Sequence, residues 1–129
     1  MAPCKCWVTA LAGVLLLPNI ATSADAAREA YQKGISCLDK RDYDAAITAF
    51  TETIRLDPRD AQAYEMRGEA FIEKGDKEQA IADFTEAIRL NPKSAEAYYN
   101  RGLAYQRKGE KAKAEEDFAK AKKLDHKAP

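Results

Sequence analysis

The sequence predicts an all-α protein in which three pairs of short helices are stacked side by side. The first observation is the placement of the glycines. Five of the six fall on a 34-residue grid, and Gly34, Gly68 and Gly102 form one series. The second is that the last two 34-residue units share 15 of 34 residues. A fixed period of this length is typical of stacked units that bury their apolar faces against one another. The predicted units are residues 27–60, 61–94 and 95–128.

Each unit contains the pattern of two amphipathic helices. In the second unit, apolar and small residues recur at three- and four-residue spacing from Ala63 to Phe71 and again from Ala80 to Ile88. This spacing places them on one face of each of two helices. Because neither helix can bury that face alone, we expect neighbouring units to supply the missing surface.

The segments between these helices carry residues that end and start helices. Gly75 and Gly109 suit the left-handed position just past a helix end. Pro58 and Pro92 push the preceding residue out of the helical region, so they stop the second helix of the first two units. We expect polar side chains to cap the helices that follow. The expected caps are Asp60, Ser94, and Asp76 in a capping box with Gln79.

The alternation of small and large residues resembles the tetratricopeptide repeat (TPR). The matching residues are Tyr64, Gly68, Phe71, Ala80, Phe84, Ala87 and Pro92; then Tyr98, Gly102, Tyr105, Ala114, Phe118 and Ala121; and Gly34, Ala46, Phe50 and Pro58. The resemblance covers about 100 of the 129 residues. It implies a right-handed α-solenoid of three helix-turn-helix units, with six short antiparallel helices.

Some columns depart from this pattern. Arg41 stands where the later units have glycine, which costs up to about 1 kcal/mol if a left-handed residue is needed. Cys37 replaces a large aromatic residue, and we expect a small core residue there or, alternatively, a partly accessible thiol that cross-links two chains. One column of the first helices holds long basic side chains, for which we expect packed stems and solvated heads. These residues are Lys33, Arg67 and Arg101.

The third unit carries charge where the first two are apolar. Two columns that hold isoleucine in the earlier units hold Glu115 and Lys122 in the third. These columns would face a following unit, so we expect a polar end that keeps the array soluble. The alternative is that this end docks on another subunit, which includes formation of a homo-oligomer.

In the TPR family, the first helices of the units line a concave face that binds a peptide or a helix. The resemblance assigns the peptide-groove residues as Tyr31, Ile35, Leu38, Glu65, Glu69, Ile72, Tyr99 and Leu103. The apolar members lie on faces that the repeat core does not need, which indicates an interaction surface. Glu65, Glu69 and Glu73 follow one another at four-residue spacing. They either favour a basic or amphipathic partner segment or form a solvated face.

One well-defined ligand of this family is not expected. Co-chaperone members clamp the C-terminal carboxylate of a heat-shock protein with lysine, asparagine and arginine side chains. A carboxylate would meet acids instead of cations in the corresponding columns of this chain. Those columns hold Tyr31, Ile35, Met66, Glu96 and Asn100.

Residues 1–26 do not follow the repeat pattern. Lys5 precedes an apolar run of about 11 residues, and small residues follow Pro18, which is the order of a secretory signal peptide. The run is shorter than the roughly 20 residues of a membrane-spanning helix. We expect cleavage after Ser23 or Ala26 and an exported protein, periplasmic or secreted.

The alternative is an uncleaved membrane anchor formed by residues 7–24. The segment also contains Cys4 and Cys6, for which no metal or redox role is expected. Cleavage would leave Cys37 as the single cysteine, which cannot form an internal disulfide.

Composition excludes several functions. The 21 basic and 21 acidic side chains give a formal net charge of +0, which disfavours nucleic acid as a partner. Three cysteines and one histidine leave little for a metal site, and no cofactor is expected. His126 has no nucleophile partner in any motif, so we predict no catalytic residues and no enzyme. Two functions remain: a module that binds a protein or peptide partner in its groove, and a structural subunit that self-associates or docks end-on in an envelope complex.

Overall fold

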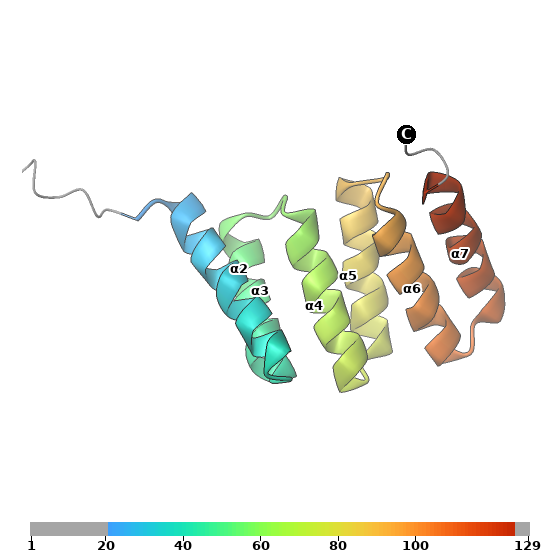
Figure 1. Cartoon of the computed structure of the whole chain (residues 1–129), viewed down its shortest axis with the longest axis horizontal. Coiled ribbons are helices and arrows are strands. Elements are labelled where there is room, and N and C mark those ends of the chain that lie inside the picture. The colour runs from blue at the N-terminus through green and yellow to red at the C-terminus, as the bar shows by residue number, and fades with distance from the viewer. Residues whose placement is uncertain (1–20, 126–129) are drawn as a thin grey trace, which may run out of the picture.

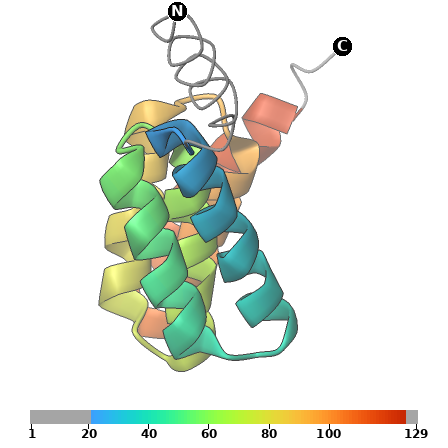
Figure 2. The ribbon, with the colours of Figure 1, turned by 90° about the vertical axis from the view of Figure 1, so that its left-hand side faces the viewer.

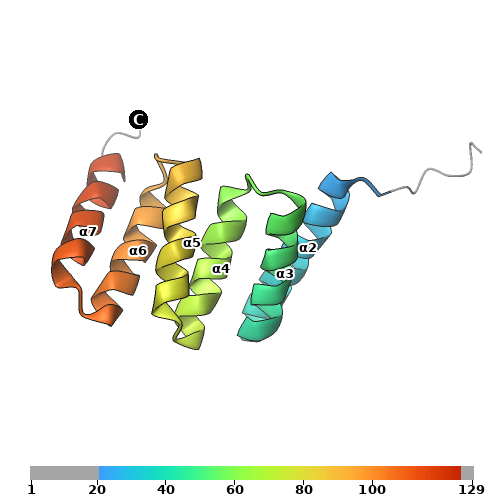
Figure 3. The same cartoon turned by 180° about the vertical axis from the view of Figure 1, so that it is seen from behind.

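The computed structural model describes residues 21–125, and these form six α-helices joined by short turns (Figure 1). The helices are α2 (Ser23–Asp39), α3 (Tyr43–Leu56), α4 (Ala61–Lys74), α5 (Lys77–Leu90), α6 (Ala95–Lys108) and α7 (Lys111–Asp125). Consecutive helices form three antiparallel pairs in a row, which confirms the predicted all-α solenoid. Views from opposite sides show α2, α4 and α6 on one side of the row and α3, α5 and α7 on the other (Figures 1 and 3). Seen along the row, the pairs stack behind one another (Figure 2).

A glycine on the first helix of each pair allows a phenylalanine on the second helix to approach. A Cβ atom added to Gly34 would lie 2.5 Å from Cε1 of Phe50, and one added to Gly68 would lie 2.8 Å from Cε1 of Phe84. Both distances are shorter than carbon atoms tolerate, so only glycine fits without a shift of the ring. The predicted role of this glycine column in close helix packing is confirmed.

Contacts between neighbouring pairs complete the core. Phe50 is fully buried and packs with Ala70 of the following pair, and Phe84 packs in the same way with Ala104. Full burial of such a ring stabilises the fold by roughly 1.5–3 kcal/mol. Phe50 and Phe84 are therefore covered by the next pair, so each of these two pairs depends on its neighbour to bury its phenylalanine.

The turns follow the predicted chemistry with one exception. Gly75 and Gly109 are left-handed at φ 98° and 88°, and Arg41 takes the same kind of conformation at φ 59°. The side chain of Asp60 caps α4 by accepting the backbone N–H of Ala63, and that of Ser94 caps α6 by accepting the N–H of Ala97. The cap expected for α5 does not form.

Asp76 is the N-cap residue of α5, but its side chain makes no capping hydrogen bond. The predicted capping box with Gln79 is therefore wrong. The backbone N–H of Asp76 donates to the carbonyl oxygen of Phe71 at 2.8 Å, as that of Asp42 does to Cys37 at 2.9 Å.

The first helix begins inside the segment predicted as a leader. Thr22 caps α2: its Oγ1 accepts the N–H of Asp25 at 3.2 Å, and the Asp25 carboxylate accepts the N–H of Thr22 at 3.3 Å. Cleavage after Ser23 or Ala26 would remove this cap. Residues 1–20 lie outside the described residues, so most of the leader, Cys4 and Cys6 remain predictions, as does His126 near the other end. Within 21–125, no helix has both the length and the apolar character needed to cross a membrane.

Candidate functional site

A hollow of about 450 Å³ crosses the side of the row formed by α2, α4 and α6. We refer to it as the concave groove. Its volume lies in the range of sites that hold small ligands or a few side chains of a peptide. It is lined by apolar Leu38, Ile72, Phe84 and Leu103, by the carboxylates Asp39, Glu69 and Glu73, and by Arg41, Tyr43, Asn100 and Arg107.

The structure distributes the eight predicted groove residues over several places. Four of them line the concave groove: Leu38, Glu69, Ile72 and Leu103. Tyr31 lines a second hollow near the start of the array, with Asp57 and Asp60. Tyr99 lines a third hollow at the other end, beside Phe118. Ile35 packs against the cluster around Phe50 and Glu65 is buried, and neither is among the lining residues of these three hollows.

The apolar candidates are more buried than the sequence predicts. Tyr31, Ile35 and Leu38 pack against the cluster around Phe50, and Ile72 packs against the cluster around Phe84. The prediction that the core does not need them is therefore wrong for these four. The array is only two helices thick, so side chains on the groove side of a first helix also reach the core. Tyr99 differs, because 51% of its surface is exposed.

The three glutamates of α4 pass from buried to exposed along the helix. Glu65 is 6% exposed and accepts a hydrogen bond from the Ser94 hydroxyl at 3.0 Å. Glu69 is half-buried and accepts one from the Asn100 side chain at 3.4 Å, whereas Glu73 is exposed. A solvated face therefore describes only Glu73, at the mouth of the groove.

Burial sets the ionisation of these groups. Burial raises the pKa of Glu65, and the hydrogen bond from Ser94 opposes this increase. Burial also raises the pKa of Glu69, and the negative charges of neighbouring glutamates add to it. The pKa of Tyr31 is raised by burial and then by the carboxylates around it. The carboxylates that act on Tyr31 are Asp60, Glu65, Glu69 and Glu96.

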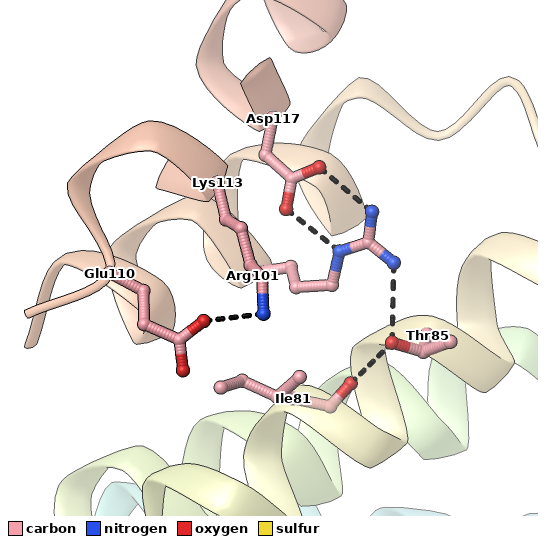
Figure 4. A network of polar contacts seen from close by, with 6 residues as sticks. All are labelled: Ile81, Thr85, Arg101, Glu110, Lys113 and Asp117. Carbon is pink, nitrogen blue, oxygen red and sulfur yellow. Dashed lines mark hydrogen bonds and ion pairs between the residues drawn. The ribbon is translucent and has the colours of Figure 1, made fainter. Parts of the chain in front are cut away.

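Two arginines each form an ion pair within their own helix pair and a hydrogen bond to the preceding pair. Arg101 donates from Nε and Nη2 to Asp117 at 2.7 and 2.8 Å, and from Nη1 to the hydroxyl of Thr85 in the preceding pair at 3.2 Å (Figure 4). Asp117 belongs to the same pair as Arg101. Figure 4 also shows the Thr85 hydroxyl donating in turn to the Ile81 carbonyl oxygen, at 2.7 Å, and the nearby ion pair of Lys113 with Glu110.

The same arrangement recurs one repeat earlier. Arg67 donates to Asp83 at 2.8 and 2.7 Å and to the Thr51 hydroxyl at 3.1 Å. In both copies the arginine side chain is 18% exposed and the aspartate 7%. We call each set an arginine network. The prediction of solvated heads is therefore wrong for Arg67 and Arg101, because a buried carboxylate holds each guanidinium.

The sequence pattern did not lead us to predict the arginine networks, which connect neighbouring helix pairs. A signal was present: each arginine has an aspartate 16 residues later and a threonine 16 residues earlier, and both spacings recur at the 34-residue period. Arg41 and Tyr43 were also missed as groove residues. They lie on a loop and at the start of a second helix, which the groove columns of the first helices do not include.

Metal chemistry finds no support in the part of the chain that the structure describes. Over residues 21–125, no three side chains of histidine, cysteine, aspartate or glutamate come together in a way that could hold an ion. Cys37 is half-buried against the Phe50 cluster as a free thiol.

The stacked pairs and the groove along one side define a helical-repeat protein of the α-solenoid class. Comparison with family models gives the particular family. A tetratricopeptide repeat model matches residues 31–86, a TPR repeat model matches 68–109, and a further tetratricopeptide repeat model matches 95–127. The chain belongs to the tetratricopeptide repeat family. Among curated proteins, none matches the chain.

Solved structures similar to this chain include domains in complex with peptides. The Arabidopsis OM64 TPR domain has a TM-score of 0.80 at 28% identity, covering 83% of this chain and 88% of that one. The TPR2B domain of yeast Sti1, in a complex with pHsp70, has a TM-score of 0.76 at 33% identity and covers 78% and 80%. The second TPR of Spaghetti (RPAP3), bound to the HSP90 peptide SRMEEVD, has a TM-score of 0.75 at 27% identity and covers 77% and 92%.

Proposed function

We propose that this protein is a non-enzymatic interaction module that holds a basic or amphipathic segment of a partner protein in the concave groove. The observation that carries the proposal is the lining of the groove. Four apolar side chains from four different helices lie beside three carboxylates in one hollow of about 450 Å³. Similar TPR domains hold peptides in solved complexes, which supports a peptide-sized ligand.

Charge decides which kind of segment fits. The groove lining holds three carboxylates and two guanidinium groups, and Arg107 donates a hydrogen bond to the carbonyl oxygen of Ile72 at 3.5 Å. The carboxylates around Tyr31 add further negative potential, and residues 61–100 hold five basic and eight acidic side chains. Such a surface attracts lysine and arginine and repels an acidic tail. The ligand therefore differs in charge from the acidic peptide SRMEEVD of the Spaghetti complex.

The proposed location follows from the N-terminal sequence. An apolar run with a basic start and a small-residue exit supports export, with the leader removed near Ser23 or Ala26. The alternative keeps residues 7–24 as an anchor that holds the groove at a membrane surface. The intact mass of the protein from its native host separates the two, because only cleavage removes the leader's mass.

Fluorescence anisotropy with two synthetic peptides tests the groove. One labelled peptide of about 12 residues carries lysines and leucines at helical spacing, and its matched control carries glutamate in place of every lysine. We expect the lysine peptide to bind and the glutamate peptide to fail. Replacing Glu69 and Glu73 with glutamine should weaken binding of the lysine peptide about tenfold, since two attractive charges are lost.

A matched variant shows whether the effect is local. Glu29→Gln together with Glu116→Gln makes the same charge change at two exposed positions away from the groove. This control should bind the lysine peptide as the parent does. Equal binding of both peptides, or equal losses in the two double variants, would refute a groove that selects basic segments.

A further inference from the structure

Within residues 21–125, the last helix pair leaves exposed a surface whose counterparts the earlier pairs bury. Phe50 and Phe84 are 0% exposed because the next pair packs over them. Phe118 occupies the same place on α7 and is only partly buried, and Tyr99 beside it is 51% exposed, with the two ring centroids 5.5 Å apart. A hollow of about 540 Å³ lies between them and Lys122. We call this surface the C-terminal end face.

The end face is not equipped to receive another repeat of the same kind. In the first two pairs, Thr51 and Thr85 accept a hydrogen bond from the arginine of the following pair. The corresponding residue of α7 is Ala119, which has no acceptor. An incoming arginine network would therefore lose one of its bonds.

The start of the array is equally unsuited to this surface, so head-to-tail stacking of copies is disfavoured. The residues of α4 and α6 that face a preceding pair are small and fully buried, such as Ala70 and Ala104. Their counterparts on α2 are polar and exposed: Glu29 and Ser36. Placing these side chains on Phe118 would bury polar groups without partners, which costs free energy.

The charge pattern of α7 fits α7 itself. The outward stripe of this helix is Glu115, Phe118, Ala119 and Lys122, and its midpoint lies between Phe118 and Ala119. When two such stripes run antiparallel, Glu115 of each helix faces Lys122 of the other, and the apolar residues meet at the centre. Helix packing at the earlier levels is also antiparallel, as for α4 on α3 and α6 on α5 (Figure 1).

We propose that the C-terminal end face binds a second copy of this chain, as a two-fold symmetric dimer in which α7 packs antiparallel on α7 of the partner subunit. A two-fold interface requires a self-complementary surface, and the stripe meets this requirement. The contact covers Phe118 and Tyr99 and leaves the concave groove of each copy open. The dimer thus goes beyond the proposed groove function and presents two grooves at once.

Charge exchange on the full-length protein tests the dimer, by sedimentation equilibrium over about 5 µM to 1 mM. The mass of the parent should rise towards two copies. Lys122→Glu or Glu115→Lys alone places like charges opposite each other at two symmetric contacts and should raise the dimer Kd at least tenfold. A mixture of the two single variants, and the doubly exchanged protein, restore opposite charges and should dimerise within about threefold of the parent.

Both substituted side chains are exposed, so these variants keep the fold. Lys33→Glu, an equal charge change at the opposite end, is the matched control and should dimerise as the parent does. A parent that stays at the mass of one chain over the whole range would overturn the proposal. So would single variants that dimerise like the parent, or a mixture that fails to recover.

Discussion

The first and second repeats share one plan but are connected differently. In both, a glycine on the first helix meets a fully buried phenylalanine on the second, at Gly34 with Phe50 and at Gly68 with Phe84. Of these two repeats, only the second has an arginine network. The first repeat has Lys33 and Ala49 in the positions of Arg67 and Asp83.

This difference shows that the glycine–phenylalanine pair and the arginine network have separate structural roles. The glycine and phenylalanine form a repeat, and the arginine network joins a repeat to the one before it through a threonine. The first repeat has no described predecessor within residues 21–125, and its outward residues are polar. The network is therefore present at each junction between described repeats and absent where the described array begins.

The shared part of the plan predicts the largest effects. Phe50→Ala and Phe84→Ala should each lower the free energy of unfolding by about 3–5 kcal/mol, because both rings are fully buried. In the monomer, at protein concentrations below those at which the dimer forms, Phe118→Ala should cost about half as much, since its ring is already partly exposed. Urea unfolding followed by circular dichroism measures all three. An equal cost at Phe118 would mean that another surface covers the C-terminal end face in solution.

The arginine network, which the first repeat lacks, predicts the next largest effect on the free energy of unfolding. Asp83→Ala leaves the mostly buried guanidinium of Arg67 without its counter-ion and should cost about 2–3 kcal/mol, less than for a fully buried pair. Adding Arg67→Lys copies the lysine and alanine of the first repeat, and we expect it to recover part of the loss because the thinner lysine can reach water. The midpoints of urea unfolding compare the single and the double variant. A double variant no more stable than Asp83→Ala would contradict this prediction.

Arg41 gives a smaller contrast between the same two repeats. It holds φ 59° where Gly75 holds φ 98°. Arg41→Gly should therefore stabilise the protein by about 0.5–1 kcal/mol, and Gly75→Arg should destabilise it by a similar amount. Thermal unfolding checks both changes. Destabilisation by Arg41→Gly would show that contacts of the arginine side chain outweigh its backbone strain.

Glu65 stands in a column that holds tyrosine in the first and third repeats, and we expect the smallest effect there. Because burial raises the pKa of Glu65, its ionised form disfavours the folded state above that pKa. The penalty is relieved as the pH falls through the raised value towards the ordinary one. Glu65→Gln should thus stabilise the protein by a fraction of a kcal/mol at neutral pH, with the advantage shrinking on acidification. A gap that widens in acid would reverse the assigned direction.

The fold was predictable because its period is carried by residues with strict local requirements. Gly34, Gly68 and Gly102 are fixed by the phenylalanine that each one faces, and Gly75 and Gly109 by their left-handed backbone. These requirements act within one repeat, so a one-dimensional pattern records them. The missing cap at Asp76 was not predictable in this way, because the residue type and its position were both favourable.

The candidate site was only partly predictable because it depends on contacts between repeats. Helix columns placed Leu38, Ile72 and Leu103 near one another correctly, but they could not tell that Ile72 also packs against the core. Glu65 is buried because the capping serine of the next repeat reaches it, which is a contact over 29 residues. Burial of this kind follows from the stacking and not from the spacing along one helix.

The arginine network also affects how an array of this kind can gain repeats by gene duplication. Residues 61–94 contain an arginine that bonds backward to Thr51 and a threonine, Thr85, that receives the next arginine. A gene duplication that inserted a second copy of this segment after residue 94 would supply every donor and acceptor at both new junctions. Duplication of residues 27–60 would not, because that segment lacks the arginine and the aspartate. The middle segment is the part of this chain that can be copied to lengthen the array without further substitution.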